Sequence, residues 1–215
     1  MTAAMPRRAM TLAEMMVVLA ILMVVGLMVF WSVQAVLGLA RAAACQNNLR
    51  QIGLSVSLYA NDWEGRIPAE RNRGILDAAR SPAWFNRLPQ YVDRADVRGR
   101  NSVFQCPLYV WTNPEIFDHA SPKSLKMNAR FDALAPHHYV QGSSPVEVDL
   151  VLFIDGVAGE TGMGQWGYCV PSGVDELRHR GRPNLLYADL HTAGGPKRPK
   201  DRTWADLVRW TSPSW

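Results

Sequence analysis

The chain has 215 residues, of which 48% are hydrophobic and 20% are charged. This composition supplies enough apolar residues for a packed core and excludes a disordered protein, and the length fits one ordinary domain with an added segment. The formal net charge is only +4, so nucleic acid is not an expected partner. The basic surplus lies within 178–209 and predicts either a solvated surface or a contact with anionic lipid headgroups or an acidic partner.

The most apolar segment lies near the N-terminus, where 15–40 contains no charged residue. A helix over this segment would be about 39 Å long, which exceeds the roughly 30 Å hydrocarbon core of a bilayer. Arg7 and Arg8 precede it, so we expect one transmembrane helix with a cytoplasmic N-terminus and an extracytoplasmic remainder. A removable secretory signal has a shorter apolar region, and a lipoprotein signal ending at Cys45 lacks the expected Leu before the cysteine.

Glu14 lies at the start of this apolar run, although a carboxylate placed centrally in a bilayer costs about 2.5 to 3.5 kcal/mol. The residues around it, 7–22, resemble the class III signal of type IV pilins and type II secretion pseudopilins. In that family a membrane aspartic peptidase cleaves five positions before a Glu and methylates the new N-terminus. The resemblance implies cleavage between Ala9 and Met10 and N-methylation of Met10, with Ala9 in place of the usual Gly and Met10 in place of the commoner Phe.

Cleavage at this position would leave an α-amino cation on Met10, one helical turn from Glu14. The resemblance implies that Glu14 pairs with the N-terminal amine of a neighbouring subunit during assembly, and it places Thr11 in the same assembly segment. The alternative is that Glu14 caps the start of the helix and pairs with lipid headgroups.

The helix is predicted to continue beyond the membrane, because apolar residues recur there at helical spacing. The residues of this stripe are Cys45, Leu49, Ile52, Val56, Tyr59 and Trp63. Turn formers and a glycine at 61–65 predict the end of the helix. The expected fold is a pilin-like α+β protein in which a leader (1–9) precedes a long helix (10–63, transmembrane over 15–40) and a small antiparallel-sheet head (64–215).

Within the head, 66–101 is loop-rich, with a short helix expected over 83–91. Buried strands are predicted at 149–156 and 184–189. The C-terminal tryptophans predict either sealing of the core and sheet edge or a partner surface; they are Trp204, Trp210 and Trp215.

A second resemblance joins separate islands of the chain: 45–53 running into 58–62, then 104–107, then 127–128, and finally His179 followed after nine residues by Asp189. Together they look like pilin-type proteins that carry the H-x9-DG signature. Leu190 stands where the signature has Gly. Because a tight Asp-Gly turn needs a positive φ, we expect a wider turn here.

The plausible constellation for site chemistry is Asp155, His179, Asp189 and His191. These residues predict either structural hydrogen bonds or a divalent metal such as calcium, which related pseudopilins hold through carboxylates and carbonyls in C-terminal loops. No cofactor is expected to be required. The adjacent His137 and His138 are expected on a loop surface.

Three cysteines in an oxidising compartment predict one disulfide and one free thiol. Cys45 with Cys106 is the favoured pair and Cys106 with Cys169 the alternative. The absence of Cys-x-x-Cys argues against a zinc ribbon or a thioredoxin-type site.

The sequence therefore predicts a structural subunit and not an enzyme. Its expected partners are prepilin peptidase, the inner-membrane assembly machinery and other pilin or pseudopilin subunits of a type II secretion pseudopilus or type IV pilus-like filament. The alternative is a membrane-tethered extracytoplasmic binding or metal-binding protein. A tethered hydrolase is less favoured, because no nucleophile motif with a base at recognisable spacing occurs.

Overall fold

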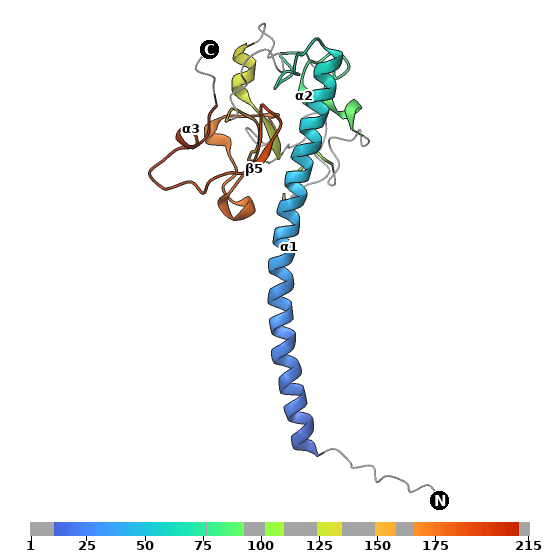
Figure 1. The fold of residues 1–215 in the computed structure, drawn as a ribbon, viewed down its shortest axis with the longest axis vertical. Helices are drawn as coiled ribbons and strands as arrows, with labels where there is room; N and C mark the ends of the chain where they lie inside the picture. Colours follow the sequence, from blue (N-terminus) through green and yellow to red (C-terminus); the bar gives the residue numbers. More distant parts are fainter. Residues whose placement is uncertain are drawn as a thin grey trace, which may run out of the picture. The chain divides into compact units, whose positions relative to one another are not determined.

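The computed structural model describes residues 11–75, 77–92, 102–109, 124–134, 149–157 and 166–210. The predicted cleavage site between Ala9 and Met10, the His137–His138 pair and Trp215 lie outside these ranges. The chain divides into two compact units, 1–40 and 41–215. Its architecture is α+β and pilin-like, with a long N-terminal helix followed by a small five-stranded sheet (Figure 1).

Helix α1 runs over Leu12–Asp62, close to the predicted 10–63. Its start is capped reciprocally: the backbone N–H of Thr11 donates to Glu14 Oε2 at 2.8 Å, and the Glu14 N–H donates to Thr11 Oγ1 at 3.3 Å. Its end carries Gly65 at φ 80°, whose N–H donates to the Ala60 carbonyl at 2.7 Å. A left-handed glycine after the last turn is a common helix terminator because it satisfies an otherwise unpaired carbonyl.

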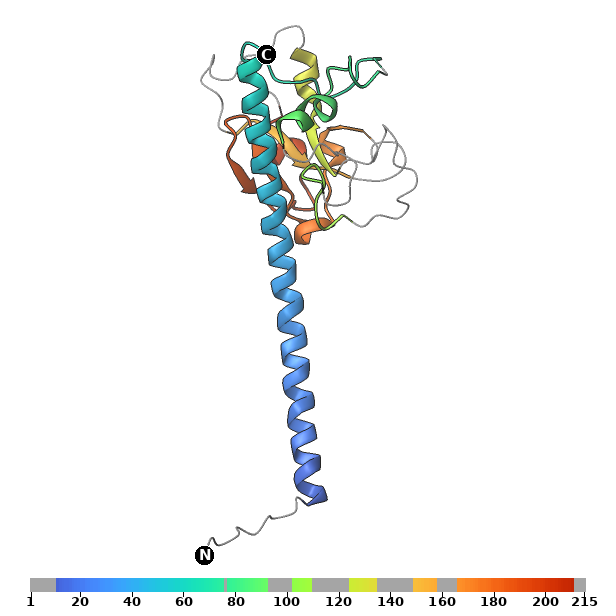
Figure 2. The ribbon, with the colours of Figure 1, turned by 90° about the vertical axis from the view of Figure 1, so that its right-hand side faces the viewer.

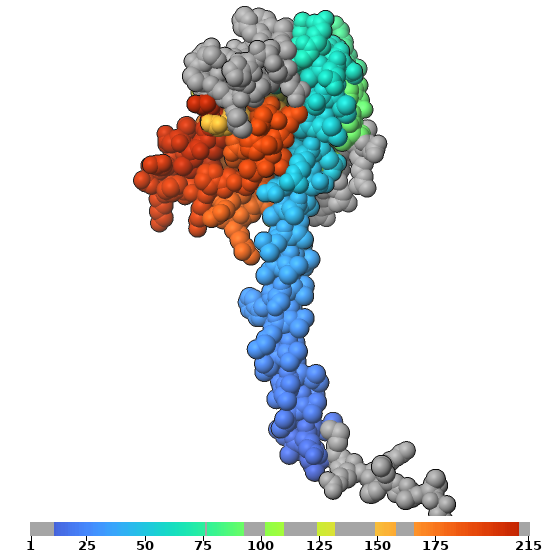
Figure 3. All heavy atoms as spheres, in the orientation of Figure 1, coloured from blue at the N-terminus to red at the C-terminus, as the bar shows by residue number. Residues whose placement is uncertain are grey.

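The first part of α1 presents apolar side chains to its surroundings. Ile21 is 57% exposed and Trp31 is 73% exposed, and Figure 3 shows this part of the helix in blue with its side chains uncovered in that view. By length and composition, α1 is the one helix among the described residues that is apolar enough to cross a membrane. This exposed apolar surface is compatible with a membrane anchor, because such area is rarely left in water.

The second part of α1 buries the predicted stripe. Cys45, Leu49 and Ile52 are fully buried, and Tyr59 is nearly so. Trp63 lies just beyond the helix and stays 45% exposed, with its ring stacked on Tyr59 at 5.5 Å between centroids. The spacing therefore identified the buried face correctly, except at its last member.

The sheet has the strand order β3-β1-β2-β4-β5. Figure 2 shows strands of the head behind the second part of α1. The strands are β1 Leu125–Asn128, β2 Val151–Asp155, β3 Tyr168–Cys169, β4 Asn184–Tyr187 and β5 Thr192–Gly194. β1 with β2, β2 with β4 and β4 with β5 are antiparallel, whereas β1 with β3 is parallel. The sheet is thus mixed and not purely antiparallel as predicted; β2 and β4 are the two strands that the sequence predicts.

Short helices connect these strands and flank them. They are α2 Trp84–Arg87, η1 Leu88–Tyr91, η3 Ala129–Leu134, η5 Pro171–Gly173, η6 Arg178–Gly181 and α3 Trp204–Leu207. α2 and η1 together occupy the segment predicted as a short helix.

The core consists of two clusters of buried residues. The first joins the stripe of α1 to side chains that include Trp84, Phe153 and Leu186. The second includes Ile154, Leu185 and the buried rings of Trp204 and Trp210, so these two tryptophans contribute to the core. Neighbouring Leu152 and Phe153 belong to the same cluster, which breaks the alternation of a regular strand, and the pairing of β2 with β4 is irregular between Val151 and Phe153.

α1 approaches β4 closely at Gly53. A Cβ atom at this position would lie 3.1 Å from Leu186 Cδ1 and 3.7 Å from Leu190 Cβ. Contacts of 3.1 Å are tighter than ordinary van der Waals packing, so the missing side chain is what lets the helix backbone lie against this strand.

Candidate functional site

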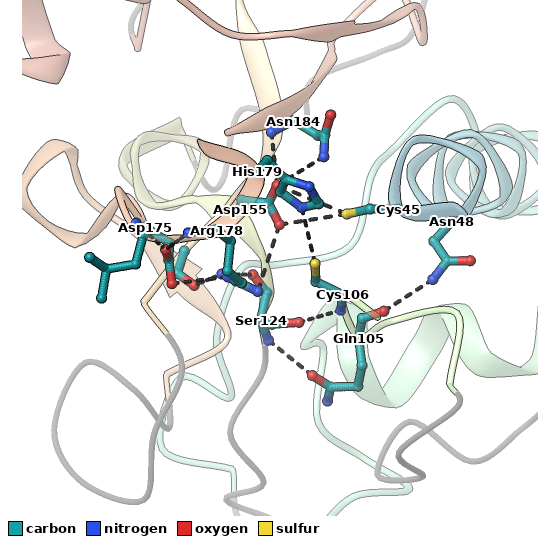
Figure 4. A network of polar contacts seen from close by, with 12 residues as sticks. Cys45, Asn48, Gln105, Cys106, Ser124, Asp155, Asp175, Arg178, His179 and Asn184 are labelled. Atoms are coloured by element: carbon teal, nitrogen blue, oxygen red, sulfur yellow. Dashed lines mark hydrogen bonds and ion pairs between the residues drawn. The ribbon is translucent and has the colours of Figure 1, made fainter. Parts of the chain in front are cut away.

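A buried polar cluster lies where four segments of the head meet (Figure 4). Cys45 comes from α1, Cys106 from 102–109, Asp155 from the end of β2 and His179 from η6. One donor atom from each residue lies within 4.8 Å of the others. We call these four residues the Cys-Asp-His cluster.

Three distances define the inside of the cluster. His179 Nε2 lies 3.1 Å from Cys106 Sγ and 3.3 Å from Asp155 Oδ2. Cys45 Sγ lies 3.6 Å from Asp155 Oδ1. The exposed fraction is 0% for Cys45 and Asp155, 1% for Cys106 and 3% for the His179 side chain. The cluster is therefore inside the protein and not on a surface.

Asp155 is the centre of the hydrogen bonds around the cluster. Its Oδ2 accepts the backbone N–H of Asn184 at 2.8 Å and the Asn184 side-chain amide at 3.2 Å, and its Oδ1 lies 3.7 Å from Arg178 Nη1. Burial raises the pKa of this carboxyl, but the Arg178 charge and the contacts with His179 and Asn184 outweigh burial and lower the pKa below its usual range. Asp155 is therefore an anion in the folded protein.

Arg178 supplies the balancing charge and is itself held on several sides. Its Nε donates to Asp175 Oδ2 at 2.9 Å, and its Nη2 donates to the carbonyls of Ser124, at 3.3 Å, and Gly156. The residue is 8% exposed. A buried guanidinium with carboxylates and carbonyls around it is a fixed positive charge beside the cluster.

His179 is carried by a strained piece of backbone. It has φ 52° and ψ 31°, and Arg180 follows at φ 60° and ψ 35°. Left-handed conformations of residues other than glycine cost about 1 to 3 kcal/mol each and persist where the surrounding structure enforces them. Here they hold the His179 imidazole inside the cluster, with Nε2 facing Cys106 and Asp155 and Nδ1 buried without a hydrogen-bond partner in the part of the chain that the structure describes.

The segment that carries Cys106 is tied to both α1 and β1. The Cys106 N–H donates to Ser124 Oγ, and the Ser124 N–H donates to Gln105 Oε1 at 3.0 Å. Asn48 of α1 donates to the Gln105 carbonyl at 3.0 Å. These bonds fix the position of Cys106 opposite Cys45.

The thiols of the chain differ in acidity. Hydrogen bonds from Cys45 and His179 lower the pKa of Cys106 to about 6, although burial raises it. The same contact with Cys106, together with burial, raises the pKa of Cys45, and burial raises the pKa of Cys169 to about 12. For His179, burial lowers the pKa, but contacts with Asp155 and Cys106 raise it to about 9. Of the three thiols, Cys106 is therefore the one whose pKa is lowered.

The geometry differs from that of a nucleophilic triad. In a triad, the nucleophile and the carboxylate contact different nitrogens of the histidine. Here Cys106 and Asp155 both face Nε2 of His179. The cysteine is also almost fully buried, so the arrangement suits binding of a small ion or formation of a disulfide better than attack on a substrate.

Only half of the predicted metal set comes together. Asp155 and His179 lie in the cluster, but Asp189 and His191 lie in the turn between β4 and β5, where they pair with each other at 2.6 Å between Oδ1 and Nδ1. The His191 ring also stacks on Tyr187 at 4.2 Å between centroids. The four residues therefore do not form one site.

The two missed members of the cluster are Cys45 and Cys106, which the sequence suggested as a disulfide pair. The structure brings them together as free thiols, and the disulfide stays a prediction. Cys169 lies on β3 in the other core cluster. The sequence pointed to this part of the cluster only through the predicted disulfide, which requires Cys45 and Cys106 to lie close together.

The predicted assembly residues form a second, separate arrangement at the start of α1. Glu14 Oε2 accepts hydrogen bonds from both the backbone N–H and the Oγ1 of Thr11, at 2.8 and 3.0 Å. Both residues are exposed. The carboxylate thus caps its own helix and still faces outward.

Comparison with known proteins agrees with this N-terminal segment. The prokaryotic N-terminal methylation motif matches residues 5–30. The match supports a type IV pilin-like prepilin signal, which is a substrate of prepilin peptidase. It does not extend to 179–189, so the likeness to the H-x9-DG signature stays a resemblance. No curated protein and no solved structure matches the chain.

Proposed function

We propose that the chain is a prepilin-like structural subunit, trimmed by prepilin peptidase between Ala9 and Met10 and then assembled into a type II secretion pseudopilus or type IV pilus-like filament. The observation that carries the proposal is the methylation motif over residues 5–30, which runs directly into the exposed apolar part of α1. A methylated apolar N-terminus followed by a helix of this length is the arrangement that filament subunits use.

The exposed surface of α1 supports assembly as well as anchoring. Its large apolar side chains between Leu12 and Leu39 are exposed in the single chain. Lipid covers such a surface before assembly, and the corresponding helices of neighbouring subunits cover it in a filament. Glu14 gives this surface a charge that a neighbour's amine can neutralise, because an unpaired carboxylate in an apolar interface is costly.

The proposed location is the inner membrane. Arg7 and Arg8 keep the N-terminus in the cytoplasm, and the head, with the Cys-Asp-His cluster, then lies on the extracytoplasmic side. Other pilin or pseudopilin subunits and the inner-membrane assembly machinery are the proposed partners.

The direct test is mass spectrometry of the intact protein and its N-terminal peptide, recovered from its own membranes. A chain that begins at N-methylated Met10 is the expected result, and a strain without prepilin peptidase is the control, in which residues 1–9 should remain. A chain that keeps residues 1–9 in the normal strain, or begins at a lipid-modified Cys45, would overturn the proposal.

A second candidate function is a membrane-tethered metal-binding protein that uses the prepilin signal only for delivery. The buried Cys-Asp-His cluster is the observation that favours it. The two candidates differ in what Glu14 does: its replacement by Ala abolishes filaments in the first and leaves a solitary head unaffected in the second.

A further inference from the structure

We infer that Cys45, Cys106, Asp155 and His179 form a closed, four-coordinate site for a zinc-type divalent ion. The donors are two sulfurs, one imidazole nitrogen and one carboxylate. Thiolate and imidazole are the ligands that Zn²⁺ prefers, and four of them in a buried cluster are typical of structural zinc sites. The set does not suit Ca²⁺, because that ion takes 6 to 8 oxygen ligands and this cluster has a single carboxylate.

The spacing of the donors fits a tetrahedral ion. Bonds of about 2.3 Å to sulfur and 2.0 Å to nitrogen or oxygen place neighbouring donors roughly 3.3 to 3.8 Å apart. His179 Nε2 lies 3.1 Å from Cys106 Sγ and 3.3 Å from Asp155 Oδ2, and Cys45 Sγ lies 3.9 Å from the same oxygen. One donor atom from each residue lies within 4.8 Å of the others, so an ion can be accommodated after side-chain shifts of about 1 Å or less.

The charges largely balance. Two thiolates and the Asp155 carboxylate around Zn²⁺ leave one excess negative charge, which would be costly inside a protein. The buried Arg178 guanidinium, 3.7 Å from Asp155 Oδ1, offsets this charge, and it shares its own positive charge with Asp175 at 2.9 Å.

The surroundings orient the donors as the outer contacts of metal sites do. Asn184 donates two hydrogen bonds to Asp155 Oδ2 and so fixes the orientation of the carboxylate. The left-handed backbone at His179 holds its Nε2 toward the other donors. His179 Nδ1 has no hydrogen-bond partner among the described residues, so one customary outer contact is missing and we expect affinity about 10- to 100-fold below that of a fully supported site.

All four coordination positions are filled by protein, and the donors are buried, so no position remains for a water or substrate. The role of the ion is therefore structural. It would join α1 to the end of β2, to η6 and to the segment 102–109, which are held at this point by hydrogen bonds and packing. A disulfide between Cys45 and Cys106 is the competing use of the same thiols, because oxidised sulfur cannot supply two thiolates.

The test uses the full-length chain purified in detergent under reducing conditions without chelators. Zinc content is measured by inductively coupled plasma mass spectrometry for the wild type, Cys106→Ser and Cys169→Ser. Cys169 is the matched control, since it is an equally buried free thiol outside the cluster. We expect about one zinc per chain in the wild type and Cys169→Ser, and a loss of at least about 10-fold in Cys106→Ser at limiting zinc.

A second measurement keeps the proposal testable if Cys106→Ser does not fold. Co²⁺ added to the metal-free wild type should give thiolate-to-cobalt charge-transfer absorption together with the intense visible d–d bands of a tetrahedral site, and added Zn²⁺ should abolish both. Three outcomes would overturn the site: free thiols that take up neither ion, equal zinc in the two cysteine variants, or protein from its own membranes in which Cys45 and Cys106 form a disulfide.

Discussion

His179 Nε2 lies 3.1 Å from Cys106 Sγ, although 73 positions separate the two residues in the chain. The contact joins two of the islands by which the sequence resembles H-x9-DG proteins: the Cys106-Pro107 island and the His179 element. Cys45, from the first island, is in the same cluster. Residues from three of these islands therefore meet at one buried junction.

Glu14→Gln should block assembly and leave the rest of the protein intact. Glutamine keeps an oxygen that can accept from Thr11, so the helix start is preserved, but it removes the charge that pairs with a neighbour's amine. We expect normal processing at Met10 and a filament yield at least about 10-fold lower. A loss of about 1.4 kcal/mol of assembly free energy per subunit contact already lowers the equilibrium constant of assembly tenfold. Filaments are counted by electron microscopy, with the N-terminal mass measured in parallel.

The matched control for this prediction is Glu64→Gln. Glu64 is an exposed acidic residue just after α1 and pairs with Arg66 at 3.2 Å. An exposed pair of this kind is worth little, so filaments should form as in the wild type. Equal filament yields from both variants would show that the charge of Glu14 is not required for assembly.

Removing the metal should lower the thermal stability of the head. An ion at about 1,000 times its dissociation constant stabilises a protein by roughly 4 kcal/mol, which corresponds to a Tm shift on the order of 10 °C in a chain of this size. We expect a chelator to produce this shift in the wild type and in Cys169→Ser. The Tm of Cys106→Ser should be low already and should not respond, and a chelator effect of the same size in that variant would place the ion elsewhere.

At position 190, a glycine variant should be more stable than an alanine variant, which is the reverse of the usual order. It lies in the turn between β4 and β5 at φ 71°, a conformation that costs a non-glycine residue about 1 to 2 kcal/mol. Leu190→Ala loses the packing of the leucine and keeps the strain, whereas Leu190→Gly loses the same packing and relieves the strain. Leu190→Gly should therefore unfold with a free energy about 1 kcal/mol higher than Leu190→Ala, measured by denaturant titration. An alanine variant as stable as the glycine variant would contradict the strained turn.

Two isoleucines of the same helix should respond differently to truncation. Ile52 is fully buried in the core of the head, and Ile21 is 57% exposed in the apolar part of α1. Ile52→Ala should cost about 2 to 5 kcal/mol of head stability, because it leaves a cavity. Ile21→Ala should change the same unfolding free energy by less than about 0.5 kcal/mol. Circular dichroism of the two variants in detergent makes the comparison, and similar losses would mean that the head does not unfold separately from the apolar segment.

The sequence predicted α1 well because its two signals, an uncharged apolar run and a stripe at helical spacing, are local and long. The sheet was harder to predict. β2 is a continuous apolar run, but β1 contains the buried Lys126, β3 has two residues and β5 begins after a strained turn. Strands this short are defined by their partners across the sheet and not by their own residues, so the parallel pairing of β1 with β3 had no sequence signal.

The sequence predicted only two of the four residues of the metal set correctly, because the other two depended on an unbroken strand. Asp189 and His191 would share one face of an unbroken strand, which made them attractive metal ligands. Leu190 breaks that strand, with β4 ending at Tyr187 and β5 beginning at Thr192. The true neighbours of His179 are cysteines far away in the chain, and no spacing rule connects them.

The close approach of α1 to β4 has a consequence for the order in which the head is made. Gly53 and the stripe around it are synthesised early, whereas Leu186, which lies against Gly53, follows more than a hundred positions later. Contacts between such distant residues form slowly, because the intervening chain must first be closed into a loop. The growing chain thus keeps an uncovered apolar stripe until β4 has been completed, and during that interval the nascent head is a target for chaperones and proteases.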